Sequence, residues 1–163
     1  MIIQSREKSV MREQPATETH SSRVVTVLSI SPDEQDHLHL QSIFEHSNWK
    51  LHKAGSLAAA LEILRRHEVP VVLCECDLKP GTWKELLEHC EAAPNPPTVI
   101  VASRLADNYL WSEVLNLGGY DVLSKPFQKE EVFRSLSLAW LHWKNLFRFP
   151  QTAPALQVMK AAS

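Results

Sequence analysis

The stretch that decides the fold is Val24-Val25-Thr26-Val27-Leu28-Ser29-Ile30, followed directly by Ser31-Pro32-Asp33-Glu34. The first seven residues form a β-branched, apolar run, which is typical of a central strand that is covered on both faces. In the next four, Ser31 can cap a helix, Pro32 suits its first position, and Glu34 completes a capping box. The stretch therefore predicts a strand that leads into a helix, which runs to about residue 46.

The rest of the chain repeats this alternation of strand and helix. Strands are predicted at residues 49–54, 70–74, 98–102 and 120–124, and helices follow them from Ser56, at 82–92, at 107–117 and at 128–147. Five strands that alternate with five helices predict an α/β domain with a doubly wound, five-stranded parallel sheet. In that architecture, ligands bind at the carboxyl ends of the strands.

Composition and charge argue against several classes of protein. A net charge of -2 provides no basic field for a phosphate backbone, so we expect no nucleic-acid partner. No apolar stretch approaches the ~20 residues that span a bilayer, and the first 22 residues lack the apolar core of a signal peptide. We therefore expect a cytoplasmic protein without membrane contacts.

The same reading sets the domain boundaries. Residues 1–22 are polar and lack periodicity, so they are predicted to form a flexible N-terminal tail. One domain is predicted at residues 23–147. A short C-terminal tail follows at residues 148–163, where Pro150 and Pro154 stand, and it is too short for an output domain. Output is then expected to pass through binding to another protein.

Residues 118–127, Gly-Gly-Tyr-Asp-Val-Leu-Ser-Lys-Pro-Phe, carry a specific resemblance. They resemble the end of a response-regulator receiver (CheY-like) domain, in which the fifth strand ends in Lys-Pro-Phe. The resemblance extends over roughly residues 23–146 and implies a flavodoxin-like fold of the receiver type. It also implies that Lys125 contacts a phosphoryl group and that the Lys125–Pro126 bond is cis.

The resemblance further implies two acidic residues after the first strand that hold Mg²⁺. Ser31 and Pro32 stand at those positions, and neither is a good Mg²⁺ ligand. Asp33 and Glu34 follow at once, and the favoured interpretation is that they only stabilise the helix N-terminus. We therefore expect no metal and no cofactor. Mg²⁺ binding is expected only under the alternative in which the domain is phosphorylated.

In the same family, an aspartate that ends the third strand accepts a phosphoryl group from a partner's histidine. Alignment of residues 71–74 as that strand places Glu75 at the phosphoacceptor position, and a register slip would make Asp77 the acceptor instead. Glu75 carries a permanent charge and is one methylene longer than aspartate. Beside Lys125 it would imitate part of an activated state, whereas an ordinary salt bridge is the simpler interpretation.

Receivers also transmit their state through a Thr or Ser at the end of the fourth strand and an aromatic residue in the fifth. The matching residues here are Ala102 and Val122, so both switch positions are degenerate. Ser103 would supply a hydroxyl only after a shift of one residue. Tyr120 is predicted to point to the same face as Val122, because side chains alternate along a strand.

The last helix is rich in aromatic residues. Trp143 and Phe147 are predicted to contribute to a partner surface on the face made by the fourth helix, the fifth strand and the fifth helix, where similar receivers bind partners or dimerise. The alternative is that the aromatic stripe packs in the core.

The sequence thus predicts a stand-alone receiver-like protein of phosphorelay signal transduction, which is not an enzyme and acts through protein contacts as a phosphate-independent pseudo-receiver. Its expected partners are signalling proteins, either a histidine kinase or a downstream effector. The first alternative is a phosphorylatable single-domain response regulator that uses Glu75 or Asp77. A distant alternative is a small flavodoxin-like enzyme or nucleotide binder, for which the chain has neither a Gly-rich phosphate loop nor a nucleophile beside a base.

Overall fold

The computed structural model describes residues 24–147. The two predicted tails, residues 1–22 and 148–163, lie outside the described residues, so those two predictions stay predictions. The boundaries of the predicted domain, residues 23–147, also stay a prediction.

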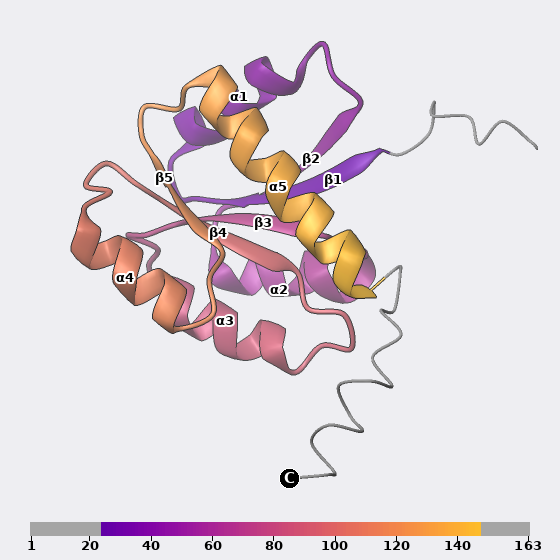
Figure 1. The fold of residues 1–163 in the computed structure, drawn as a ribbon, viewed down its shortest axis with the longest axis vertical. Helices are drawn as coiled ribbons and strands as arrows, with labels where there is room; N and C mark the ends of the chain where they lie inside the picture. The colour runs from indigo at the N-terminus through magenta and orange to yellow at the C-terminus, as the bar shows by residue number, and fades with distance from the viewer. Residues whose placement is uncertain (1–23, 148–163) are drawn as a thin grey trace, which may run out of the picture.

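One parallel sheet forms the middle of the molecule (Figure 1). Its strands are β1 (Val25–Ile30), β2 (Trp49–Ala54), β3 (Val71–Glu75), β4 (Thr98–Ser103) and β5 (Asp121–Ser124). The strands lie in the order β2-β1-β3-β4-β5, and every neighbouring pair is parallel. This order reverses direction next to β1, which places the switch point of the sheet between β1 and β3. The predicted fold class is confirmed.

Five helices cover the two faces of this sheet. They are α1 (Glu34–Phe44), α2 (Leu57–Arg66), α3 (Trp83–Glu91), α4 (Asn108–Asn116) and α5 (Lys129–Phe147). One core cluster joins the sheet to α2, α3 and α4, and a second joins the opposite face to α1 and α5. Figure 1 shows α5 lying across one face of the sheet, the face that α1 also covers, with α3 and α4 on the opposite side.

The central strands are buried on both faces, as their apolar sequence predicts. All five residues of β3 and all six of β4 are buried, and β1 has a single half-buried position. Such strands need a helix layer on each side, because neither face can meet water. In β1, β3 and β4, the only charged side chain is that of Glu75, at the end of β3.

The helix starts follow capping chemistry, with one difference from the sequence prediction. Ser56 and Thr82 cap α2 and α3 as predicted, since their side-chain oxygens accept hydrogen bonds from Ala59 and Glu85. The prediction that Ser31 caps the first helix is wrong. Asp33 is the cap, because its backbone is extended there and its Oδ1 accepts a hydrogen bond from the Gln35 N–H at 2.9 Å.

Two further features of the backbone bear on the prediction. Gly118 follows α4 with φ +102, a left-handed conformation that ends a helix and favours glycine. The Lys125–Pro126 bond is cis, as the resemblance implied. Within residues 24–147, the helices are all too short or too polar to cross a membrane.

Candidate functional site

Three segments that lie far apart in the sequence meet at the carboxyl edge of the sheet. The loop after β1 carries Ser31, β3 ends at Glu75, and Lys125 follows directly after β5. The first turn of α1 adds Asp36 to this group. The doubly wound topology brings these segments together, since all five strands point to the same edge.

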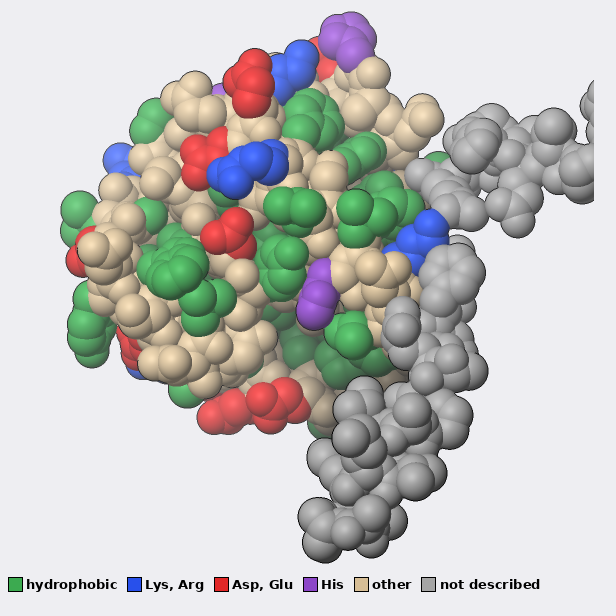
Figure 2. All heavy atoms as spheres, in the orientation of Figure 1, with side chains coloured by type: hydrophobic (Ala, Val, Ile, Leu, Met, Phe, Trp, Pro, Cys, Tyr) green, Lys and Arg blue, Asp and Glu red, His purple; other side chains and the backbone are tan. Residues whose placement is uncertain are grey.

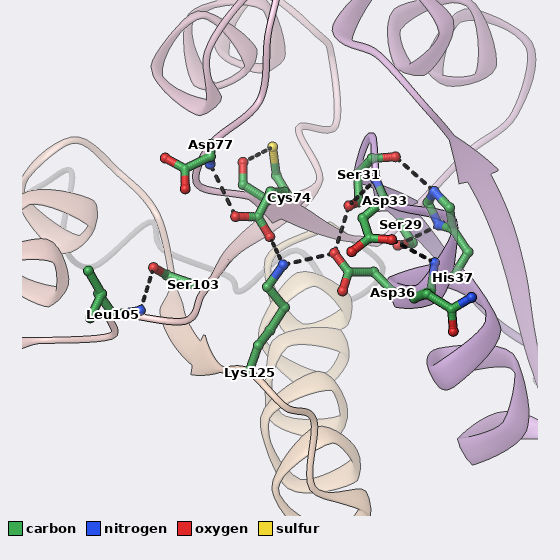
Figure 3. A network of polar contacts seen from close by, with 12 residues as sticks. Ser29, Ser31, Asp33, Asp36, His37, Cys74, Asp77, Ser103, Leu105 and Lys125 are labelled. Carbon is green, nitrogen blue, oxygen red and sulfur yellow. Dashed lines mark hydrogen bonds and ion pairs between the residues drawn. The ribbon is translucent and has the colours of Figure 1, made fainter.

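The ammonium group of Lys125 lies between two carboxylates (Figure 3). Its Nζ donates a hydrogen bond to Asp36 Oδ2 at 2.8 Å and forms an ion pair with Glu75 Oε2. The side chains of Lys125, Asp36 and Glu75 are only 7%, 13% and 9% exposed. We call these three residues the Lys125 clamp. Their burial separates the clamp from surface ion pairs, which water and salt screen.

Backbone and hydroxyl groups hold both carboxylates of the clamp. Ser31 Oγ donates to Asp36 Oδ2 at 2.7 Å and accepts a hydrogen bond from the Asp33 N–H at 3.1 Å. The backbone N–H of Asp77 donates to Glu75 Oε1 at 3.2 Å. One oxygen of each carboxylate thus faces Lys125. Further hydrogen bonds fix the orientation of both groups.

The clamp also sets the charge state of Lys125. Burial alone lowers the pKa of Lys125, but the hydrogen bonds to Asp36 and Glu75 and the charges of both carboxylates outweigh burial. The pKa of Lys125 consequently lies above its ordinary value, and the group is an ammonium at neutral pH.

Ser31 and its neighbours lie differently from a pair of acidic metal ligands. Ser31 is buried and points at Asp36, while Pro32, Asp33 and Glu34 are exposed on the loop and in the first turn of α1. The carboxylate of Asp33 is used as the helix cap. This agrees with the interpretation that Asp33 stabilises the helix N-terminus.

Glu75 occupies the position that the alignment gave it. It is the last residue of β3 and pairs with Ala102 of β4, and its carboxylate reaches Lys125. Asp77 is exposed in the next loop and touches the clamp through its backbone N–H, with its own carboxylate pointing away from Lys125 (Figure 3). Whether either residue accepts a phosphoryl group stays a prediction.

Sequence reasoning missed Asp36. The family motif concerns the two residues directly after the first strand, and Asp36 is not one of them. An acidic residue in the first turn of a helix is also readily explained by its favourable interaction with the helix dipole. The available signal was the register of α1. With Asp33 as the cap, Asp36 is the third residue of α1. It therefore lies in the first turn of the helix, close to the end of β1.

Cys74 and Cys76 flank Glu75 without forming part of the clamp. Cys74 is buried and Cys76 is half-buried. Burial raises the pKa of both thiols, and neighbouring acidic residues raise it further. Both groups are therefore protonated at neutral pH and weak nucleophiles.

The two degenerate switch positions lie on opposite faces of the sheet. Ala102 belongs to the core cluster beneath α1 and α5, and Val122 to the cluster beneath α2, α3 and α4. The prediction that Tyr120 shares the face of Val122 is wrong. Tyr120 precedes β5, so the alternation of a strand does not reach it, and its ring packs on the α5 side beside His142.

The predicted partner surface needs a correction at Trp143. This side chain is 2% exposed and cannot present a surface. It continues the buried stripe of α5, in which residues 132, 136, 139 and 143 are spaced by four, three and four positions. Phe147 is half-buried, and its ring packs against that of Trp143. Trp143 therefore packs in the core, as the alternative interpretation of the aromatic stripe predicted.

Other apolar side chains are exposed on the face where a partner surface was predicted. Trp111 and Leu115 of α4 are 48% and 37% exposed, and Leu138 and Leu141 of α5 are 48% and 43% exposed. Figure 2 shows hydrophobic side chains spread over the visible face of the molecule, with acidic and basic side chains among them. We call these four residues the α4–α5 surface.

Comparison with known proteins agrees with this geometry. The family "response regulator receiver domain" matches residues 28–137. A signal receiver domain of an HD domain-containing protein from Pseudomonas fluorescens Pf-5 is 25% identical, with a TM-score of 0.71, and the match covers 78% of this chain and 95% of that one. No curated protein sequence matches the chain.

Two other solved structures share the fold at lower identity. The receiver domain of a putative LuxO repressor protein from Vibrio parahaemolyticus is 16% identical, with a TM-score of 0.69 over 74% of this chain and 93% of that one. A CheY-like receiver domain protein from Methanospirillum hungatei JF-1 is 16% identical, with a TM-score of 0.66, and the match covers 75% of this chain and 98% of that one. Receiver domains of response regulators act in two-component signalling, where they interact with kinases and effectors. The family match over most of the sheet and helices, together with the Lys-Pro-Phe end of β5, shows that this chain belongs to the response regulator receiver domain family.

Proposed function

We propose that this receiver works without phosphorylation and without Mg²⁺. In this proposal, the Lys125 clamp holds the carboxyl edge of the sheet in one arrangement, and the protein signals by binding other proteins. It has no catalytic step, and it acts in the cytoplasm. The observation that carries the proposal is the position of the Lys125 ammonium between the carboxylates of Asp36 and Glu75.

The set of oxygen donors supports the absence of Mg²⁺ from the mechanism. Mg²⁺ needs octahedral oxygen ligands and usually takes one or two free carboxylates. Here Asp36 and Glu75 already bind Lys125, Ser31 donates its hydroxyl hydrogen to Asp36, and Pro32 has no side-chain oxygen. In residues 24–147, acidic, His and Cys side chains form no group of three that is placed to bind a metal. The residues present therefore do not fit the ion.

The packing around the clamp supports the same conclusion. The space enclosed by Ser31, Asp36, Glu75 and Ala102 has no room for a water-sized sphere, whereas a cavity needs about 10–15 Å³ to hold one water molecule. A phosphoryl group on Glu75 would have to open this packing, or else displace Lys125 towards the cavity of about 610 Å³ that Asp36 and Lys125 line on their other side. It would also bring further negative charge towards Asp36.

The energetics favour a persistent clamp. To release Glu75 for phosphorylation, its carboxylate must leave Lys125 and remain buried without its cation. Breaking a buried ion pair by removal of one partner costs about 3–5 kcal/mol. Since Glu75 and Lys125 already neutralise each other, the domain has an internal substitute for the charge pairing that phosphorylation would create.

The alternative is a phosphorylatable receiver that uses Asp77. Its exposure gives a phosphodonor access. Against it, the Asp77 carboxylate points away from Lys125, so the cation that would stabilise an acyl phosphate is committed elsewhere (Figure 3).

Protein binding is proposed to use the α4–α5 surface. Its exposed tryptophan is of the residue type that anchors interfaces, and its three leucines add exposed apolar area. A histidine kinase, an effector or a second copy of the chain would fit this surface, and the proposal extends to each of them as a protein partner.

The proposal is tested by intact mass spectrometry after incubation with a small phosphodonor and Mg²⁺. Wild type, Glu75→Gln and Asp77→Asn are compared, with Glu88→Gln, an exposed carboxylate on α3, as the matched control. A competent receiver in the same buffer shows that the donor is active. We expect no adduct on any form of this protein.

A hydroxylamine-labile phosphoryl adduct on the wild type would contradict the proposal. Its loss in Glu75→Gln would identify Glu75 as the acceptor. Its loss in Asp77→Asn alone would favour the alternative.

A further inference from the structure

His37 is a buried polar residue that the clamp does not include. It lies in α1, one residue after Asp36, and is 3% exposed. A buried imidazole needs hydrogen-bond partners for both ring nitrogens, because each unpaired polar atom costs desolvation energy. Its two partners are Ser29 in β1 and Ser31 in the loop that follows β1. In Figure 3, both serines lie between His37 and Lys125.

The contacts of His37 define its tautomer. Nε2 lies 2.9 Å from the carbonyl oxygen of Ser31, which can only accept, so Nε2 carries the hydrogen. In the neutral ring, Nδ1 then accepts a hydrogen bond from the hydroxyl of Ser29 at 3.1 Å. The Ser31 carbonyl therefore selects the tautomer, and the Ser29 hydroxyl, which can donate, satisfies the other ring nitrogen.

Ser31 connects His37 to the clamp. Its carbonyl oxygen accepts from His37, and its hydroxyl donates to Asp36 Oδ2, the same oxygen that accepts from Lys125. Two hydrogen bonds hold the Ser31 backbone: its carbonyl oxygen accepts from His37, and its N–H donates to the Ala54 carbonyl oxygen at 3.0 Å. Because the backbone sets where the side chain starts, the 2.7 Å contact of the Ser31 hydroxyl with Asp36 depends in part on His37. A continuous series of hydrogen bonds runs from Ser29 to Lys125.

We infer that His37 is a positioning residue for the Lys125 clamp: by fixing the Ser31 backbone, it keeps the Ser31 hydroxyl on Asp36 and so keeps Asp36 on Lys125. This inference rests on the proposed function, because it concerns how the clamp is held. It gives the buried histidine a role beyond filling space beneath the loop.

The test measures the pKa of Lys125 in the full chain by NMR titration of labelled lysine side chains. The Lys125 signal is assigned by its loss in Lys125→Met. In wild type we expect a pKa above the ordinary lysine value. In His37→Phe the ring remains but both hydrogen bonds are lost, so the acid dissociation constant of Lys125 is expected to rise by at least about two-fold.

Two comparisons separate positioning from general stability. His37→Gln keeps an amide donor near the Nε2 position and is expected to restore most of the wild-type pKa. Leu40→Ala removes a fully buried side chain from the same helix without touching the loop, so it should lower stability and leave the Lys125 pKa unchanged. If His37→Phe fails to fold, Ser29→Ala removes the hydroxyl that binds His37 Nδ1 and should shift the Lys125 pKa in the same direction, by less.

The outcomes distinguish a failure of the Lys125 clamp from a failure of the role assigned to His37. A wild-type Lys125 pKa at the ordinary value would overturn the clamp itself, and the role of His37 with it. A raised wild-type value that persists in His37→Phe or Ser29→Ala would overturn only the inference about His37. An equal shift in Leu40→Ala would also overturn it, since that would show a general loss of packing.

Discussion

Replacement of Lys125 by methionine removes the cation of the clamp while keeping most of the side-chain volume. Asp36 and Glu75 would then remain as two buried carboxylates, 13% and 9% exposed, that face each other across the vacated position. Loss of one partner from a buried ion pair costs about 3–5 kcal/mol. With a slope of about 2 kcal/mol per molar urea, typical for a domain of this size, the unfolding midpoint should fall by roughly 1.5–2.5 M.

The pH dependence of this cost follows from the chemistry. In Lys125→Met, burial and mutual repulsion raise the pKa of the two carboxyl groups in the folded state. A group with a raised pKa when folded loses stability as the pH rises through that pKa, so the penalty should shrink on acidification, as one carboxyl group takes up a proton. Urea unfolding at about pH 5 and pH 7.5 measures the difference.

Lys84→Met is the matched control for this substitution. Lys84 forms an ion pair with Glu113 between α3 and α4, and its side chain is 49% exposed. Water and salt screen surface pairs of this kind, so removal of this cation should cost far less than removal of Lys125. A loss in Lys125→Met no larger than in this control would refute the reasoning. So would a loss that Glu75→Gln, combined with Lys125→Met, fails to reduce.

Three further predictions follow from the same geometry. Because the pKa of Lys125 is raised on folding, its stabilising contribution is complete below the ordinary lysine pKa of about 10.4 and is lost as the pH rises through the folded value; urea unfolding between about pH 9.5 and 11.5 should show a larger loss in wild type than in Lys125→Met. Millimolar Mg²⁺ should leave the melting temperature of wild type unchanged and raise that of Lys125→Met, whose two carboxylates are free for a cation, as differential scanning fluorimetry would show. Trp143→Ala should lower the unfolding free energy by about 3–5 kcal/mol, because its side chain is buried, whereas Trp111→Ala should stay within about 0.5 kcal/mol; equal losses in urea unfolding would contradict the assignment of Trp143 to the core.

Much of the fold follows from short-range rules that the sequence displays. The apolar runs of β1, β3 and β4 need cover on both faces, and this alone leads to a parallel sheet between two helix layers. The caps Ser56 and Thr82 mark the starts of α2 and α3, since a side-chain oxygen at that position satisfies a free N–H. Such signals are local, so one sequence is enough to read them.

The errors arise where a residue has two chemically reasonable roles. Ser31 and Asp33 are both good caps, and only the backbone conformation decides that Asp33 takes the role. Ser31 is then free to bind Asp36. Trp143 has the aromatic side chain of an interface residue, yet its spacing from Leu136 and Ala139 places it on the buried stripe. A helical wheel centred on that stripe would have found it.

The clamp could be predicted only in part. Lys125 and Glu75 follow from the Lys-Pro-Phe sequence and from the end of β3, because parallel strands end at one edge. Asp36 and His37 depend on how α1 leaves the loop after β1, which is a matter of helix register in three dimensions. No periodicity in the sequence specifies that contact.

The Lys125 clamp is expected to persist in the presence of Mg²⁺ and a phosphoryl group mimic. The most direct measurement is the amide NMR spectrum of the labelled protein before and after addition of Mg²⁺ with beryllium fluoride, an acyl phosphate mimic, beside a competent receiver. The account predicts unchanged signals for Ser31, Glu75, Ala102 and Lys125 while the competent receiver responds. Saturable shifts centred on Glu75 and Lys125 would contradict it and would identify a working phosphorylation site.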